Sequence, residues 1–475
     1  MFSIPEYVTR VIETLHSRGY QAYLVGGAVR DLMLQRTPGD WDVATDATPE
    51  QVEGIFGDLS IPTGKRFGTI TVKSYGSQGD ENFLEVTTFR SDGVYSDGRR
   101  PDAVTFSRDI LEDLGRRDFT VNAIAYDIYS GKVIDPFQGA RDIARRRIVT
   151  VGAAQERFRE DALRMLRAIR LAAELDFEVS PGVMEAIQEN SGLIKNVAWE
   201  RIRDEMSKLL ISERPKLGVE LLRRSTLLGY IRPELLETVD VAQGEGHLWT
   251  VYRHSLEAAQ NIEPELHLRL AALLHDVGKP RTKVVNQAGE VHFYRHEIVG
   301  AEMARGALVR LRYPSEFVER VALLIEKHMF YYDAGCTDRA IRRLIGQVGL
   351  DAIYDLAKLR RADRIATGTR EGLGANMQAF LERVESVLAK GKVFTVTDLA
   401  VDGHDVMEVL DIPEGPRVGA VLQRLLDAVM ERPSLNTRED LLKMLEEMRE
   451  TEGSRKWDET GSGGQGDATG ATPGA

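Results

Sequence analysis

The stretch Tyr23-Leu24-Val25-Gly26-Gly27-Ala28-Val29-Arg30-Asp31, followed by Gly39-Asp40-Trp41-Asp42-Val43, decides how the N-terminal part of the chain folds. An apolar strand runs into paired glycines, a short helix follows, and the chain turns at Pro38-Gly39 into a second strand with the pattern Asp-x-Asp. Because side chains alternate between the two faces of a strand, Asp40 and Asp42 are predicted to point the same way.

Two carboxylates on one face beside a glycine turn are what a magnesium–triphosphate site requires. Carboxylate oxygens are ligands that the hard Mg²⁺ ion prefers. Glycines such as Gly26 and Gly27 let phosphates approach the backbone N–H groups where a helix begins. The pattern therefore predicts nucleotidyl transfer, with Asp40 and Asp42 as catalytic magnesium ligands.

The composition is that of a soluble protein with more than one domain. The chain has 475 residues, of which 43% are hydrophobic and 29% charged, and we find no apolar run near the roughly 18 residues of a membrane span. Its N-terminus lacks the basic and apolar regions of a signal peptide. Its single cysteine, Cys336, cannot form an internal disulfide. These features predict a cytoplasmic protein with no membrane partner.

The charge is unevenly distributed. A net charge of −12 argues against a surface coated with nucleic acid, but binding depends on local patches. Residues 141–170 contain nine arginines and four acidic residues. This excess could follow a phosphate backbone, while a solvated helix face with ion pairs explains it equally well.

Hydrophobic periodicity predicts an α+β head followed by a helical remainder. Strands are expected over 22–26, 42–44, 69–73 and 83–89, and helices over 5–18, 28–35 and from Thr48-Pro49-Glu50. Glu85 lies in the middle of a strand, where it could be a third metal-binding carboxylate or an ordinary solvent-facing acid. Residues 91–101 are polar and rich in turn formers, which predicts a mobile loop beside the site. From about 138 to 445 the pattern is helical apart from a hairpin-like stretch near 283–294.

Two further stretches carry polar side chains suited to a nucleotide. In Arg116-Arg117-Asp118-Phe119-Thr120-Val121-Asn122-Ala123 the arginines could hold phosphates, and Asp118 or Asn122 could bond ribose hydroxyls; alternatively Asp118 caps a helix. Residues 159–170 read as one helix, which places Asp161 and Arg164 on one face. That pair is either an ordinary ion pair or a reader of bases.

The base-reading alternative has a definite chemistry. Cytosine and adenine each present an exocyclic amine beside a ring nitrogen acceptor, which matches a carboxylate beside a guanidinium. Uracil and guanine present a carbonyl in place of the amine. An Asp161–Arg164 pair would therefore select CTP and ATP, since the other bases would leave buried polar groups unpaired.

Taken together, these motifs resemble the class II tRNA nucleotidyltransferases, the bacterial CCA-adding type, which share the polymerase-β-like nucleotidyltransferase fold with bacterial poly(A) polymerases. The resemblance rests on four motifs in order over residues 20–210: Leu24 to Asp31, Asp40-x-Asp42, Arg116 to Ala123, and Arg159-Glu160-Asp161-x-x-Arg164-x-x-Arg167. It implies that Asp40, Asp42 and Glu85 are catalytic, with Mg²⁺ as cofactor. It also implies tRNA, CTP and ATP as partners and a nucleotide-binding set of Gly26, Gly27, Arg30, Arg117, Asp118, Asn122, Glu160, Asp161, Arg164 and Arg167.

The same resemblance extends to two other segments. Residues 199–205 resemble the helical neck motif of the family. The loop at 91–101 resembles the flexible loop of members that add the terminal A, which favours complete CCA or A-only addition.

The histidines form a second group. Seven of the nine lie between residues 247 and 328, and imidazoles and carboxylates on separate helices of a bundle commonly build a metal site. Residues 247–370 resemble the HD-domain phosphohydrolases, whose four-residue core is matched by His254, His275, Asp276 and Asp363. His296 and His328 match the additional ligands of the two-metal subgroup. This resemblance implies hydrolysis of phosphate esters with Mg²⁺ or a divalent transition metal.

We therefore expect five segments: a nucleotidyltransferase head (1–148), a helical neck and body that selects nucleotides and binds RNA (149–245), an HD domain (246–370), a helical tail (371–450) and a disordered tail (451–475). The nearest alternatives are an A-adding or CC-adding partial enzyme or a poly(A) polymerase. A nucleotide phosphohydrolase with a non-catalytic nucleotide-binding head, and a non-catalytic RNA-binding module, are alternatives of other classes.

Overall fold

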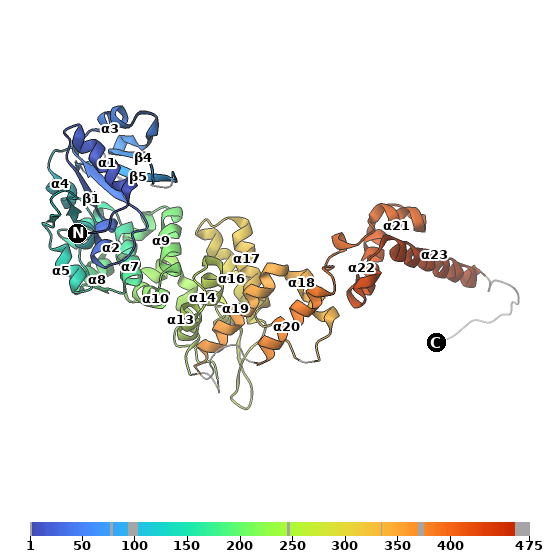
Figure 1. Ribbon diagram of the computed structural model, residues 1–475. Coiled ribbons are helices and arrows are strands. Elements are labelled where there is room, and N and C mark those ends of the chain that lie inside the picture. Colours follow the sequence, from blue (N-terminus) through green and yellow to red (C-terminus); the bar gives the residue numbers. More distant parts are fainter. Residues whose placement is uncertain are drawn as a thin grey trace, which may run out of the picture. The chain divides into compact units, whose positions relative to one another are not determined.

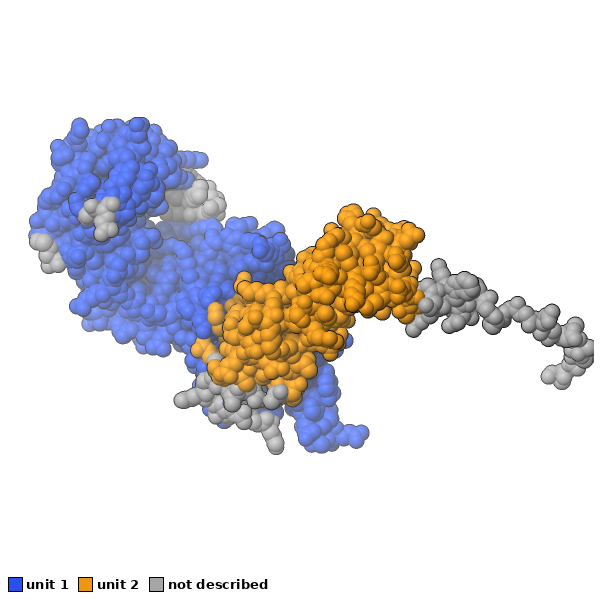
Figure 2. Space-filling view, turned by 45° about the vertical axis from the view of Figure 1, so that its right-hand side comes forward, with its two compact units in different colours: residues 1–326, 362–370 blue, residues 327–361, 371–475 orange. Residues whose placement is uncertain are grey.

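The computed structural model describes residues 2–76, 79–93, 103–244, 248–333, 335–368 and 375–460 (Figure 1). The chain divides into two compact units (Figure 2), one of residues 1–326 and 362–370 and the other of residues 327–361 and 371–475. No helix among the described residues combines the length and the apolar character needed to cross a membrane.

A seven-stranded sheet forms the N-terminal part of the first unit. Its strand order is β3-β4-β5-β2-β1-β8-β9, and β2 pairs with β5 in parallel while the other pairs are antiparallel. The strands are β1 (Ala22–Val25), β2 (Asp42–Thr45), β3 (Ser60–Gly64), β4 (Thr69–Tyr75), β5 (Glu81–Thr88), β8 (Ala125–Tyr126) and β9 (Val133–Ile134). The mixed sheet confirms the expected α+β head.

Short helices surround the sheet, and the sequence explains where they begin. In α1 (Glu6–Ser17) the apolar side chains recur on one face, and Val8 and Ile12 are fully buried. Thr48 caps α3 (Pro49–Phe56) through a capping box, in which its side chain accepts from the backbone of Gln51. The other helices of the head are α2 (Gly27–Met33), α4 (Ile110–Gly115) and α5 (Gly139–Ala144).

The predicted loop at 91–101 begins in a small hairpin. Strand β6 (Arg90–Asp92) pairs with β7 (Val104–Phe106). Residues 94–101, which hold most of the predicted loop, lie outside the described residues, so its proposed role stays a prediction.

A helical segment follows the head, as expected. Helix α7 packs on α9 and α10, and α13 packs on α10 and α14. The helices are α6 (Ala154–Glu160), α7 (Leu163–Leu175), α8 (Pro181–Asn190), α9 (Trp199–Ile211), α10 (Pro215–Arg224), α11 (Leu227–Ile231), α12 (Pro233–Leu236), α13 (Val251–Asn261), α14 (Leu266–Leu274), α15 (Lys279–Thr282), α16 (His296–Arg310) and α17 (Ser315–Lys327).

Two short strand pairs interrupt these helices. The hairpin expected near 283–294 is present as β12 (Lys283–Val285) and β13 (Val291–Phe293). A second pair, β10 (Arg147–Ile148) with β11 (Glu178–Val179), was not predicted, because two-residue strands are too short to show an alternating pattern.

The expectation of one helix over residues 159–170 was wrong. Helix α6 ends at Glu160, Asp161 has an extended backbone (φ −146°, ψ 106°), and α7 begins at Leu163. The cause is local, because the Asp161 carboxylate accepts a hydrogen bond from the backbone N–H of Leu163 at 3.0 Å. When an aspartate side chain accepts from the backbone N–H two residues ahead, this hydrogen bond competes with the one that the N–H would make in a continuous helix.

The second unit is helical and has its own apolar core. Buried side chains such as Val406, Leu425 and Leu441 form one cluster within residues 393–445. Its described helices are α18 (Asp338–Val348), most of α19 (Leu350–Ala366), α20 (Ala375–Ala389), α21 (Gly403–Leu410), α22 (Pro416–Glu431) and α23 (Arg438–Thr460).

Helix α23 continues to Thr460, into the segment 451–475 that was expected to be disordered, and the bounds of that segment stay a prediction. The residues beyond 450 include glutamate, arginine and lysine, which are good helix formers, and the helix is anchored by buried Leu441 and Leu445. Residues 461–475 lie outside the described residues, so disorder there stays a prediction.

A close approach of two backbones holds α5 against the turn that carries Asn122. A Cβ added at Gly139 would lie 2.1 Å from the carbonyl oxygen of Thr120, whereas one added at Gly182 meets nothing within 4 Å. We predict that Gly139→Ala destabilises the fold by about 1–3 kcal/mol, as overpacking does, and that Gly182→Ala does not. Thermal unfolding followed by circular dichroism measures both variants. Equal melting temperatures for the two would contradict the prediction.

Candidate functional site

A cavity of about 650 Å³ brings together most of the residues expected to bind a nucleotide. Its walls come from the glycine turn, from strands of the head sheet, and from helices α7 and α9. The lining residues include Gly26, Gly27, Asp42, Glu85, Arg117, Asp118, Asn122, Asp161, Arg164, Arg167 and Arg201.

The glycine turn leaves room that a side chain would fill. Gly26 has a φ of +74° and is the N-cap of α2. A Cβ at this position would lie 2.9 Å from an Arg117 Nη1 and 3.6 Å from Asp42 Oδ2. A residue without a side chain is therefore needed both for the backbone conformation and for the space between these two charges.

Strand pairing places two of the expected carboxylates side by side. In the parallel β2–β5 pair, Asp42 lies opposite Glu85. Burial raises the pKa of Asp42, the nearby Arg117 lowers it, and Glu85 and Asp40 raise it, with a net value of about 6. The concentration of negative charge fits a site for a divalent cation, because such a cation would compensate the repulsion.

The expectation that Asp40 and Asp42 point the same way stays a prediction. Strand β2 begins at Asp42, so Asp40 lies in the preceding turn and is exposed, while the ring of Trp41 is buried. The burial of Trp41 fixes this turn in place. Asp40 is nevertheless close enough to raise the pKa of Asp42.

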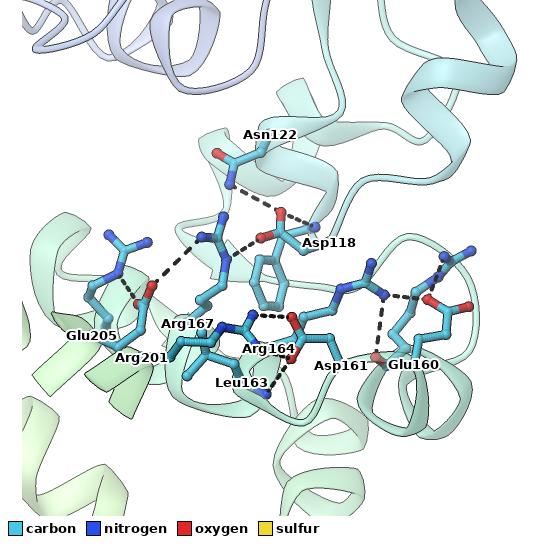
Figure 3. A network of polar contacts seen from close by, with 12 residues as sticks. Asp118, Asn122, Glu160, Asp161, Leu163, Arg164, Arg167, Arg201 and Glu205 are labelled. Carbon is cyan, nitrogen blue, oxygen red and sulfur yellow. Dashed lines mark hydrogen bonds and ion pairs between the residues drawn. The ribbon is translucent and has the colours of Figure 1, made fainter. Parts of the chain in front are cut away.

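Asp118 is held by several donors rather than capping a regular helix. Its carboxylate accepts from Arg167 Nε at 2.7 Å, from its neighbour Phe119 N at 2.9 Å and from Asn122 Nδ2 at 3.4 Å (Figure 3). Burial works to raise the pKa of Asp118, but the arginines Arg167 and Arg164 outweigh it and lower the pKa to about 2. Arg30 is linked to the same group, because it donates to Asn122 Oδ1 at 2.7 Å.

Asp161 and Arg164, the two residues expected to read the base, have other partners. The alternative expectation was an ion pair between the two. Arg201 of α9 donates to both carboxylate oxygens of Asp161, at 3.3 and 2.7 Å. Arg164 forms an ion pair with Glu160, which also accepts from Arg157 at 3.0 Å. Both Asp161 and Arg164 line the cavity.

Sequence reasoning assigned no role to Arg201 or Glu205, although both lie in the stretch 199–205 that was singled out. Glu205 accepts from Arg170 Nε at 2.6 Å and lies 3.7 Å from Arg167. The sequence signal for these two residues was the helical spacing of charged residues in that stretch. This spacing did not indicate which residues Arg201 and Glu205 would contact.

A second constellation lies in the first unit, among the helices that follow residue 250. His254, on α13, and the residues His275 and Asp276, after α14, offer ligand atoms within 4.8 Å of one another. Asp363, on the part of α19 that belongs to this unit, lies 3.0 Å from His254 Nε2 and 3.7 Å from His275 Nε2. His296, the first residue of α16, has its Nε2 atom 3.4 Å from Asp276 Oδ1.

Hydrogen bonds orient the imidazoles of this cluster. His275 Nδ1 lies 2.8 Å from the carbonyl oxygen of Ala272, and His296 Nδ1 lies 2.9 Å from that of Phe293. If each Nδ1 donates to its carbonyl, the Nε2 atoms are left to face the carboxylates, as in histidines that bind metals. Burial works to lower the pKa of His275, but Asp276 and Asp363 outweigh it and raise the pKa to about 10. The donor set of imidazole nitrogens and carboxylate oxygens fits a divalent metal.

His328, the remaining expected ligand, belongs to the second unit and is buried, with 2% of its surface exposed. Its role as a ligand stays a prediction. Lys279 was not expected here, and its ammonium lies 2.7 Å from Asp276 Oδ2.

Three known protein families match successive parts of the chain. They are the poly A polymerase head domain over residues 22–149, the probable RNA and SrmB-binding site of polymerase A over residues 176–238, and the HD domain over residues 244–368.

Relatives that match over most of the chain are CCA-adding enzymes. The CCA-adding enzyme of Geobacillus stearothermophilus is 35% identical over 441 residues, which cover 93% of this chain and 96% of that one. The CCA-adding enzyme of Lactobacillus johnsonii is 33% identical over 436 residues, which cover 90% and 94%. The crystal structure of the Bacillus stearothermophilus CCA-adding enzyme in complex with CTP superposes with a TM-score of 0.72 at 31% identity, covering 95% and 98% of the two chains. The Thermotoga maritima CCA-adding enzyme complexed with tRNA shares the fold at 18% identity, with a TM-score of 0.51 and coverage of 92% and 93%.

The raised pKa of Asp42 has a consequence for stability. The folded protein binds this proton more tightly than the unfolded chain, so the charged form costs stability, and the cost grows as the pH rises from about 4 to about 6. We predict that Asp42→Asn stabilises the metal-free protein above pH 6, by no more than about 3 kcal/mol, and that the gain disappears near pH 4. Thermal unfolding in the presence of a chelator measures the gain.

The matched control is Glu81→Gln, which changes an exposed acid on the same strand as Glu85. It removes a carboxylate that is paired with Lys73 at the surface and should not give the gain in stability above pH 6. An Asp42→Asn variant that is no more stable than the parent at pH 8 would contradict the prediction.

Proposed function

The chain belongs to the family of CCA-adding enzymes, which are tRNA nucleotidyltransferases, and from this premise we propose that it adds CMP, CMP and AMP in turn to the 3′ end of tRNA. CTP and ATP are the proposed nucleotide substrates. The observation that carries the proposal is the 650 Å³ cavity, which joins the carboxylates of Asp42 and Glu85 to the polar side chains of Asp161 and Arg164. One end suits a metal-bound triphosphate and the other a base.

Asp40, Asp42 and Glu85 are the proposed holders of Mg²⁺. When bound there, two magnesium ions would supply charge neutralisation for the triphosphate and for the pyrophosphate that leaves, and would acidify the attacking 3′-hydroxyl. The protein's own part is to hold the nucleotide. The turn at Gly26 and Gly27 offers backbone N–H groups to phosphate oxygens, and Arg117 lies beside the same turn.

Base choice is proposed to come from Asp161 and Arg164. A carboxylate accepts from the exocyclic amine of cytosine or adenine, and a guanidinium donates to the neighbouring ring nitrogen. Uracil and guanine would bring a carbonyl oxygen to Asp161 and leave two acceptors facing each other. The penalty for such a buried mismatch favours CTP and ATP.

We predict that Asp42→Ala and Asp40→Ala abolish nucleotide addition and leave tRNA binding close to that of the parent, because they remove charge from the triphosphate end only. Incorporation of labelled CMP into a tRNA that lacks CCA measures the first effect, and a filter-binding assay measures the second. Glu81→Ala, which removes an exposed acid on β5, is the control and should retain full activity. Near-normal turnover by either aspartate variant would refute the assignment of metal ligands.

A second activity is proposed for the HD domain because His254, His275, Asp276 and Asp363 converge on one point. We propose that these residues hold a divalent metal, Mg²⁺ or a transition metal, and that His296 and His328 add to the set. A metal bound there would supply activated water for the hydrolysis of a phosphate ester. Terminal phosphates and 2′,3′-cyclic phosphates on RNA ends are the proposed substrate class.

We predict that the purified protein retains a divalent metal and hydrolyses 2′,3′-cyclic AMP, and that His275→Ala loses both properties but still incorporates CMP. Elemental analysis and a phosphodiesterase assay measure these effects, and a chelator should abolish the hydrolysis. His292→Ala is the control, since His292 lies on β13 with 39% of its side chain exposed and outside the cluster. Unchanged hydrolysis in His275→Ala would contradict the assignment.

A further inference from the structure

The ion pair between Arg201 and Asp161 joins the helix break to a residue forty positions further along the chain. Both oxygens of the carboxylate accept from the guanidinium, at 3.3 Å from Nη1 and 2.7 Å from Nη2. Figure 3 shows the Arg201 guanidinium facing the Asp161 carboxylate. Both side chains line the nucleotide cavity and are mostly buried, with 23% and 12% of their surfaces exposed.

We propose that Arg201 is a positioning residue for base selection, which acts by fixing the orientation of the Asp161 carboxylate. This inference rests on the proposed function, in which Asp161 accepts a hydrogen bond from the incoming base. It assigns to α9 a part in nucleotide choice that the motif resemblance did not indicate.

Arg201 leaves part of the hydrogen-bonding capacity of the Asp161 carboxylate unused. An ionised carboxylate has about four acceptor positions. Among the described residues, Asp161 Oδ1 accepts from the backbone N–H of Leu163 and from Arg201, and Oδ2 accepts from Arg201. One acceptor position therefore remains on Oδ2, at the cavity.

A single fixed acceptor discriminates well between bases. The amine of cytosine or adenine can donate to it, whereas the carbonyl of uracil or guanine places oxygen against oxygen. Without the planar guanidinium, the carboxylate could rotate and present its acceptor in another direction. Arg201 opposes this rotation, because its forked guanidinium bonds both carboxylate oxygens and so favours one plane.

The alternative is that the pair only ties α9 to the break between α6 and α7. A purely structural role would lower stability or overall turnover, but it would change the reactions of correct and wrong nucleotides by the same factor. The ratio of the two therefore separates a positioning residue from a structural one.

The test measures kcat and KM for CTP and for UTP in single-nucleotide addition to a tRNA that lacks CCA. The variants are Arg201→Met and Arg201→Lys, and the control is Arg203→Met, whose parent side chain lies on the same helix and pairs with Asp204. We expect Arg201→Met to reduce the ratio of kcat/KM for CTP over UTP about tenfold or more, chiefly through a higher KM for CTP and faster use of UTP. Arg201→Lys keeps the charge without the fork and should recover part of the ratio. Arg203→Met should match the parent.

A parent protein that uses CTP and UTP equally would overturn the proposed function itself. A parent that discriminates, together with an Arg201→Met variant of the same ratio, would overturn only the role of Arg201. If the methionine variant does not fold, Arg201→Lys decides the question, because a ratio equal to that of the parent contradicts the inference and a reduced ratio supports it.

Discussion

The parallel pairing of β2 with β5 sets Asp42 opposite Glu85, and the rest of the site is arranged around this repulsion. Burial raises the pKa of Asp42, and the neighbouring carboxylates of Glu85 and Asp40 raise it further, to a net value of about 6. Arg117, beside the glycine turn, relieves part of the charge. The fold thus maintains a locally unfavourable arrangement that a divalent cation and a triphosphate would stabilise, which is a common property of catalytic sites.

Among other charged residues at and behind the cavity, the charges are matched instead. Arg167 compensates Asp118, Arg170 compensates Glu205, and Arg201 compensates Asp161. These pairs connect the head, α7 and α9, and they hold Asp161, the residue proposed to read the base with Arg164, in a defined position before a nucleotide arrives. Preorganised polar groups can discriminate between bases because a mismatch leaves them without partners.

The sequence was sufficient for the parts of the fold that depend on local patterns. The glycine turn, the strands on either side of it and the α+β head follow from periodicity and from Asp-x-Asp. The break at Asp161 could not be predicted, since residues 159–170 have strong helix propensity and the break depends on the bond to Leu163 and on Arg201.

The account as a whole depends on base choice by a protein surface rather than by a nucleic-acid template. The most direct measurement is the sequence of the 3′ ends formed on a tRNA that lacks CCA when all four nucleoside triphosphates are supplied at equal concentration. The account predicts that the ends are C-C-A, that addition then stops, and that uridine and guanosine are absent. Runs of adenosine, addition that ends at C-C, or frequent uridine would contradict it.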